Sequence, residues 1–86
     1  MKMLNNILYG VSLQAVAGTT DIEVNNLVFD SRVVKAGDVF FALPGTRVDG
    51  HDFIPTVEKQ VPAAIICQAL PEKLDEKITY VQVENT

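Results

Sequence analysis

One segment of the 86-residue chain constrains the fold more than any other, because it joins two apolar runs through a helix pattern. The first run, Val39–Leu43, is uninterrupted, as in a central strand that is covered on both faces. We expect a helix over residues 50–60, with Phe53, Val57 and Val61 on one face. It should end before Pro62 because proline disfavours helical backbone in the preceding residue. Ala63–Cys67 is the second run. A strand, a helix and a strand in this order predict a right-handed crossover between parallel strands.

The remaining apolar segments add further elements to this unit. The spacing of apolar residues predicts a short amphipathic helix near the N-terminus, and the other runs read as strands. These expected elements are a helix over residues 2–9 and strands over residues 11–16, 22–24, 27–29 and 78–83. We therefore predict an α/β fold over residues 1–86, a single small domain whose mixed sheet contains the strand–helix–strand crossover. A chain of this length buries one modest core.

Composition excludes several classes of function. With 11 acidic against 7 basic residues the net charge is −4, whereas binding of nucleic acid requires a basic face. No stretch approaches the ~20 apolar residues that span a bilayer, and the N-terminus lacks the apolar core of a signal peptide. The single cysteine, Cys67, lies in an apolar run and reads as a core residue of a cytoplasmic protein. A small phosphorylated ligand remains compatible with this composition.

Two polar loops follow predicted strands and form the candidate ligand site. Asp30-Ser31-Arg32 follows the strand over residues 27–29, and residues 44–49 follow Val39–Leu43. If these strands are parallel, both loops lie at one edge of the sheet, where ligands bind in open α/β folds. Arg47 precedes a helix N-terminus, a setting that favours an anion, and the Ser31 hydroxyl can donate and accept. The alternatives are a local turn hydrogen bond for Ser31 and a solvated side chain for Arg47.

Other polar residues near these loops read as structural. Asp30 and Arg32 can pair with other loops and so hold the shape of the site. Asp49 and Asp52 suit the N-terminus of the predicted helix, and helix capping explains them better than an acid–base pair does. His51 reads as a polar residue of the same turn. The sequence contains no phosphate loop of the Walker type, no set of metal ligands and no catalytic triad, so we expect no catalytic residue and no metal site.

Three blocks of sequence carry a family resemblance. They are Phe29-Asp30-Ser31-Arg32, residues 34–43 and residues 45–54, the last of which contains Asp-Gly-His-Asp-Phe. In this order and spacing they resemble the N-terminal domain of the Mur ligases. The resemblance is nearest to the ligases that add the third residue, meso-diaminopimelate or L-lysine, to UDP-N-acetylmuramoyl-L-alanyl-D-glutamate. Two departures are Ala36, where the family often has proline, and Val61-Pro62, which replaces a common Gly-Ala.

The resemblance implies that the chain is the first of three domains of a cytoplasmic ligase that acts in peptidoglycan synthesis. It implies that this domain holds the UDP part of the UDP-N-acetylmuramoyl dipeptide, and that the fragment alone is inactive. ATP and magnesium would bind the central domain, so no cofactor is expected here, and the C-terminal domain would select the amino acid. The sequence stops at Thr86 without a closing signal, which agrees with a domain boundary. The resemblance implies substrate contacts at Phe29, Ser31, Thr46, Arg47 and Val48.

Two alternative functions stay open. The ligase that adds the D-alanyl-D-alanine dipeptide has similar Asp-Ser-Arg and Asp-Gly-His-Asp-Phe blocks in its N-terminal domain. The Gly45-Thr46 pair and the short N-terminal helix favour the third-residue enzyme. The second alternative, of a different class, is a stand-alone interaction module without a ligand.

Overall fold

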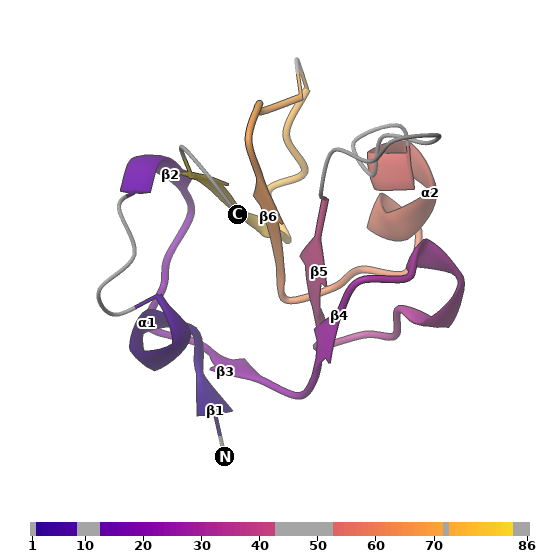
Figure 1. Cartoon of the computed structure of the whole chain (residues 1–86), viewed down its shortest axis with the longest axis horizontal. Helices are drawn as coiled ribbons and strands as arrows, with labels where there is room; N and C mark the ends of the chain where they lie inside the picture. Colours follow the sequence, from indigo (N-terminus) through magenta and orange to yellow (C-terminus); the bar gives the residue numbers. More distant parts are fainter. Residues whose placement is uncertain (1, 9–12, 43–52, 72, 84–86) are drawn as a thin grey trace.

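A computed structural model describes residues 2–8, 13–42, 53–71 and 73–83 of the chain (Figure 1). Five strands form one sheet in the order β2-β7-β6-β5-β4, and a separate two-stranded sheet pairs β1 with β3. In chain order the elements are β1 (Lys2–Met3), α1 (Leu4–Ile7), β2 (Leu13–Ala17), β3 (Glu23–Val24), β4 (Leu27–Val28), the 3-10 turn η1 (Ser31–Val33), β5 (Val39–Phe41), α2 (Ile54–Glu58), β6 (Ala64–Cys67) and β7 (Thr79–Val83).

The larger sheet is mixed, as predicted. Strands β4, β5, β6 and β7 run parallel to one another, and β2 joins the edge of β7 in the antiparallel direction. Helix α2 connects β5 to β6, so the predicted crossover is confirmed. The parallel pairing of β4 with β5 confirms the condition under which the two candidate loops leave the sheet at one edge. The strands agree with their predicted bounds to within two residues.

Two hydrophobic clusters cover opposite faces of the sheet, and α1 and α2 lie on different sides of it (Figure 1). Side chains alternate along each strand, so Phe40 packs on the α2 face while Val39 packs on the α1 face. Burial of each large apolar side chain stabilises the fold by about 1.5–3 kcal/mol. The α2-face cluster consists of Val34, Phe40, Ala42, Ile54, Val57, Ile65, Cys67, Ile78 and Tyr80. The α1-face cluster consists of Leu4, Leu8, Val24, Val39, Ala64, Ile66, Val81 and Val83.

The predicted helix over residues 2–9 is wrong in its extent. Lys2–Met3 pairs with β3 as a strand, and the helix α1 covers only Leu4–Ile7. A backbone hydrogen bond also joins this segment to the chain just before β3: the Leu4 N–H donates to the Ile22 carbonyl at 2.9 Å. The helical spacing nevertheless identified buried positions correctly, since Leu4 and Leu8 both lie in the α1-face cluster.

Residues 50–52 of the predicted helix over residues 50–60 lie outside the described residues; within the rest, α2 ends earlier than predicted and its buried face differs. It spans Ile54–Glu58 with Phe53 as its N-cap. Ile54 and Val57 face the core, whereas Phe53 and Val61, predicted to share the buried face, are 38% and 42% exposed. Val61 lies beyond the helix with a φ of +51°, and this left-handed backbone removes it from the helical face.

Candidate functional site

The candidate site lies at the edge of the sheet where β4 and β5 end. Phe29 and Ser31 follow β4, while Ala42 follows β5, and parallel pairing places these strand ends at the same edge. The structure therefore brings Phe29 and Ser31 to the predicted place. Four residues predicted for the other loop, namely Thr46, Arg47, Val48 and Asp49, lie outside the described residues, as do His51 and Asp52 of the predicted helix start. Their predicted roles stay predictions.

Phe29 presents an aromatic ring at this edge. Its side chain is 63% exposed, the largest exposure among the large hydrophobic residues that the structure describes. One face of the ring stacks on Phe41 of β5, with the ring centroids 5.0 Å apart and the planes inclined by 27°. Sequence reasoning missed Phe41 because it treated the β5 run only as core. The parallel register of β4 and β5 is the signal that pairs the two rings.

Asp30 and Arg32 stabilise the turn η1 that follows Phe29. The Asp30 carboxylate caps the turn by accepting the Arg32 backbone N–H at 2.9 Å. It also accepts two hydrogen bonds from the guanidinium, from Nε at 3.0 Å and from Nη2 at 2.8 Å. The predicted structural role is thus observed, but the two residues pair with each other rather than with other loops. The turn carries Ser31 in a defined backbone conformation.

The same contacts perturb the ionisation of this pair. Hydrogen bonds from the Arg32 guanidinium and backbone lower the pKa of Asp30 from 3.8 to about 2. The carboxylate in turn raises the pKa of Arg32. Both groups are exposed to solvent, so the pair shapes the loop and contributes little to global stability. Asp30 therefore stays ionised next to Ser31 at any physiological pH.

The Ser31 hydroxyl has no hydrogen-bond partner among the residues that the structure describes. The Val33 backbone N–H, which a local turn bond to Ser31 would use, instead donates to the Asp30 backbone carbonyl at 3.2 Å. The local turn alternative for Ser31 is therefore not what the structure has. Its side chain is half-buried, and its hydroxyl can both donate and accept a bond from a polar ligand.

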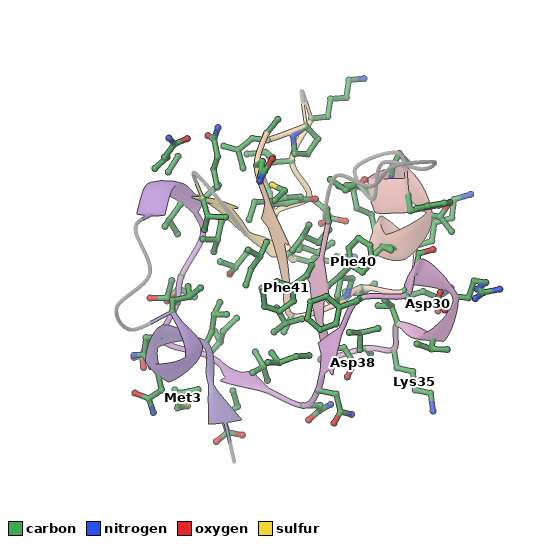
Figure 2. The ribbon with its side chains drawn as sticks, viewed as in Figure 1. Met3, Asp30, Lys35, Asp38, Phe40 and Phe41 are labelled. Carbon is green, nitrogen blue, oxygen red and sulfur yellow. The ribbon has the colours of Figure 1, made fainter. Side chains whose placement is uncertain are left out.

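A buried carboxylate anchors the segment between η1 and β5. Asp38 is 3% exposed and accepts the Lys35 backbone N–H at 3.0 Å, closing the turn before β5 (Figure 2). Its own carbonyl accepts the Ala63 N–H at 2.8 Å, which joins this turn to the start of β6. Val34, at the end of η1, packs into the α2-face cluster. The loop that carries Ser31 is thus fixed at its far end to the core.

The described residues contain no group of three or more His, Cys, Asp or Glu side chains that could hold a metal ion. Magnesium, which the family resemblance implies for a complete ligase, therefore finds no such donor set among the described residues. Cys67 is fully buried, and burial raises the pKa of its thiol to about 11, so it is an inert core residue as predicted. None of the helices that the structure describes has the length and apolar character of a membrane span.

Comparison with known proteins agrees with these features. Residues 23–86 match the family described as "Mur ligase family, catalytic domain". The chain belongs to the Mur ligase family. This match covers both strands that border the candidate site, the turn η1 and the whole crossover.

Relatives in sequence are named as diaminopimelate ligases and as muramyl-tripeptide synthetases. The UDP-N-acetylmuramoyl-L-alanyl-D-glutamate–2,6-diaminopimelate ligase of Bacteroides fragilis is 39% identical over 96% of this chain. The UDP-N-acetylmuramyl-tripeptide synthetase of Borrelia garinii is 36% identical over 98% of it. In both cases the chain spans only 17% of the relative's length. The Mur ligase domain described here thus corresponds to a small part of those enzymes.

Solved structures of the same family share the fold. The MurF ligase of Thermotoga maritima, in complex with ADP, superposes with a TM-score of 0.64 over 76% of this chain at 35% identity. MurF from Acinetobacter baumannii superposes with a TM-score of 0.65 over 73% of the chain at 28% identity. The chain covers 14% and 13% of those two proteins. These matches confirm the predicted small α/β domain with a mixed sheet.

Proposed function

We propose that this chain is the N-terminal domain of a three-domain, ATP-dependent Mur ligase, and that it binds the UDP part of UDP-N-acetylmuramoyl-L-alanyl-D-glutamate. One observation carries the proposal. The parallel pairing of β4 with β5 brings Phe29 and Ser31 to the edge of the sheet at which β5 also ends. Sequence identity to diaminopimelate ligases over nearly the whole chain supports UDP-N-acetylmuramoyl-L-alanyl-D-glutamate as the substrate.

The proposed site contacts are Phe29, Ser31, Thr46, Arg47 and Val48. The exposed ring of Phe29 offers an apolar surface, and the Ser31 hydroxyl offers a polar group within two positions of it. The Asp30–Arg32 pair holds the turn that connects them. Thr46–Val48 would supply backbone N–H groups to the diphosphate, since such groups bind anions well in loops that precede helices.

The contribution of this domain to the ligase reaction is positioning. In the proposed enzyme, ATP bound elsewhere would activate the terminal carboxylate of the substrate for attack by the amine of the incoming amino acid. A remote grip on the nucleotide allows binding energy to orient that carboxylate. The 86-residue chain should therefore bind UDP and show no ligase activity. We expect it to act in the cytoplasm, where the nucleotide substrate is made.

A titration of the 15N-labelled chain with UDP tests this proposal. Amide shifts confined to residues 29–32 and 45–49 are the expected result. Ser31→Ala should weaken UDP binding by about 3- to 10-fold, the effect of losing one hydrogen bond to a ligand. Gln14→Ala is the control, because Gln14 is an exposed polar residue on β2, at the opposite edge of the sheet.

Two other outcomes would point elsewhere. An absence of shifts at millimolar UDP, in a chain whose spectrum shows it folded, would favour an interaction module. The D-alanyl-D-alanine-adding ligase is the second candidate function, and the likeness in fold to MurF proteins favours it. Because both enzymes would use the same nucleotide, competition between UDP-muramoyl dipeptide and UDP-muramoyl tripeptide for the full-length enzyme separates them.

A further inference from the structure

We infer that Phe41 is a positioning residue for the proposed nucleotide site, holding the ring of Phe29 so that its other face is presented to a planar ligand ring. The inference rests on the proposed function and adds a residue to it. Phe41 lies in β5, away from the two loops named as substrate contacts. Its predicted action is indirect, through the stacked pair, and not through contact with the substrate.

The backbone register places the two rings together. Leu27 pairs with Val39 and Val28 with Phe40, so the next residues along the two chains, Phe29 and Phe41, come side by side. Val28 packs against the α2-face cluster and Phe41 against the α1-face cluster, so the stacked rings lie on the α1 face of the sheet. With the ring centroids 5.0 Å apart and an interplanar angle of 27°, the arrangement is a favourable aromatic pair.

The two rings of the pair differ in how tightly the surrounding structure holds them. Phe41 is half-buried and belongs to a strand hydrogen-bonded on both sides, between β4 and β6 (Figure 2). Its partner in β6, Ile66, is buried. Phe29, by contrast, follows the last residue of the edge strand β4 and is 63% exposed. Phe41 is therefore the fixed member, and it limits the orientations that Phe29 can adopt.

An oriented ring binds a flat ligand better than a freely rotating one, because less side-chain entropy is lost on binding. Bases stack on exposed aromatic side chains in the same way, whatever the base. The Phe29–Phe41 pair should thus favour ligands that carry a base over ligands that carry only phosphate. The discriminating quantity is the affinity for UDP relative to that for inorganic pyrophosphate.

The test uses the 86-residue chain with UDP and with pyrophosphate as probes, followed by NMR. Phe41→Leu removes the ring and keeps an apolar side chain of similar size, and Phe41→Tyr keeps the ring. Phe53→Leu is the matched control, because Phe53 is a partly exposed phenylalanine at the start of α2. Upfield shifts of the uracil protons report stacking on a ring, and a folded amide spectrum validates each variant.

We expect Phe41→Leu to weaken UDP binding roughly 3- to 10-fold, as loss of an aromatic pair implies, while pyrophosphate binding is unchanged. The upfield uracil shift should shrink in Phe41→Leu and persist in Phe41→Tyr and Phe53→Leu. Unchanged UDP affinity and uracil shift in Phe41→Leu, with Ser31 still responding to UDP, would overturn this inference and leave the proposed function intact.

Failure of the wild-type chain to bind UDP at residues 29–32 would instead overturn the proposed function, and this inference with it. A measurement on the unmodified chain covers the case in which Phe41→Leu does not fold. Nuclear Overhauser contacts between the Phe29 and Phe41 rings should be present in the free chain and persist with UDP bound. Their absence would overturn the positioning role.

Discussion

The hydroxyl of Tyr80 donates a hydrogen bond to the carboxylate of Glu58, which joins β7 to the last residue of α2. The same hydroxyl accepts a hydrogen bond from the Asp75 backbone N–H at 3.1 Å, so the Tyr80 side chain also holds the loop before β7 in place. Because α2 also packs against η1, this contact holds the helix that supports the turn carrying Ser31 (Figure 1).

Replacing Tyr80 with phenylalanine should lower the free energy of unfolding by about 1–3 kcal/mol. The ring would still fill the core, but the Asp75 N–H and the Glu58 carboxylate would lose their partner. Urea denaturation of Tyr80→Phe measures the loss. Glu58→Gln is the control, since an amide oxygen can still accept from the hydroxyl, and it should lose less. Equal stability of Tyr80→Phe and the wild type would contradict the prediction.

Stability should fall steeply in alkali. Burial and the hydrogen bond to Glu58 raise the pKa of Tyr80 from 10.0 to about 12. The folded state therefore holds this proton more tightly than the unfolded state, so the contribution is complete below about pH 10 and is lost as the pH rises towards 12. Burial of Cys67, which raises its pKa from 9.0 to about 11, acts in the same direction from about pH 9 upwards.

Urea midpoints measured from about pH 8 to about pH 12 check this linkage. The decline should be shallower in Tyr80→Phe and in Cys67→Ala, because each variant removes one titrating group. If the urea midpoint of both variants fell with pH as steeply as that of the wild type, other groups would dominate the alkaline transition.

The Asp30 carboxyl should titrate far below an ordinary aspartate. The hydrogen bonds from Arg32 hold its pKa at about 2, and Arg32→Leu should return it towards 3.8 because the guanidinium donors are lost. The local stability that this pair gives to η1 is present above about pH 4 and is lost as the pH falls through about 2. A 13C NMR titration of the Asp30 carboxyl carbon measures both values. Equal midpoints in the two proteins would show that the pair does not form in solution.

Val61→Gly should stabilise the chain. Val61 is a β-branched residue with a φ of +51°, a conformation that costs about 1–2 kcal/mol for residues other than glycine. Glycine removes that cost but adds freedom to the unfolded chain, so we expect a net gain of about 0.5–1 kcal/mol. Thermal denaturation measures the gain, and Lys59→Gly, at a right-handed position with φ −66°, should destabilise instead. A loss of stability in Val61→Gly would count against the left-handed backbone.

Much of the fold and part of the site followed from local patterns. Apolar runs marked the strands, and the order strand–helix–strand implied the parallel crossover that the structure contains. The placement of Phe29 and Ser31 at one edge with the end of β5 followed from the same rule. Thr46, Arg47 and Val48 lie outside the described residues, so their part in the site stays a prediction.

The errors have two causes, one a contact with residues distant in the chain and the other the local backbone at the end of α2. Lys2–Met3 became a strand because β3 offers it backbone partners, which no local propensity reveals. Phe53 and Val61 left the predicted buried face because α2 is short and Val61 turns into the left-handed region before Pro62.

The amino-acid sequence alone determined which segments form the strands of the larger sheet and that β5 and β6 are parallel, because periodicity and element order are properties of the chain itself. Only the tertiary structure decided that Phe29 rests on Phe41, that Asp30 bonds to Arg32, and that Tyr80 reaches Glu58. The Phe29–Phe41 and Tyr80–Glu58 contacts depend on which side chains meet across strands and helices, and the Asp30–Arg32 pair depends on the backbone of the turn η1; spacing along the sequence encodes neither.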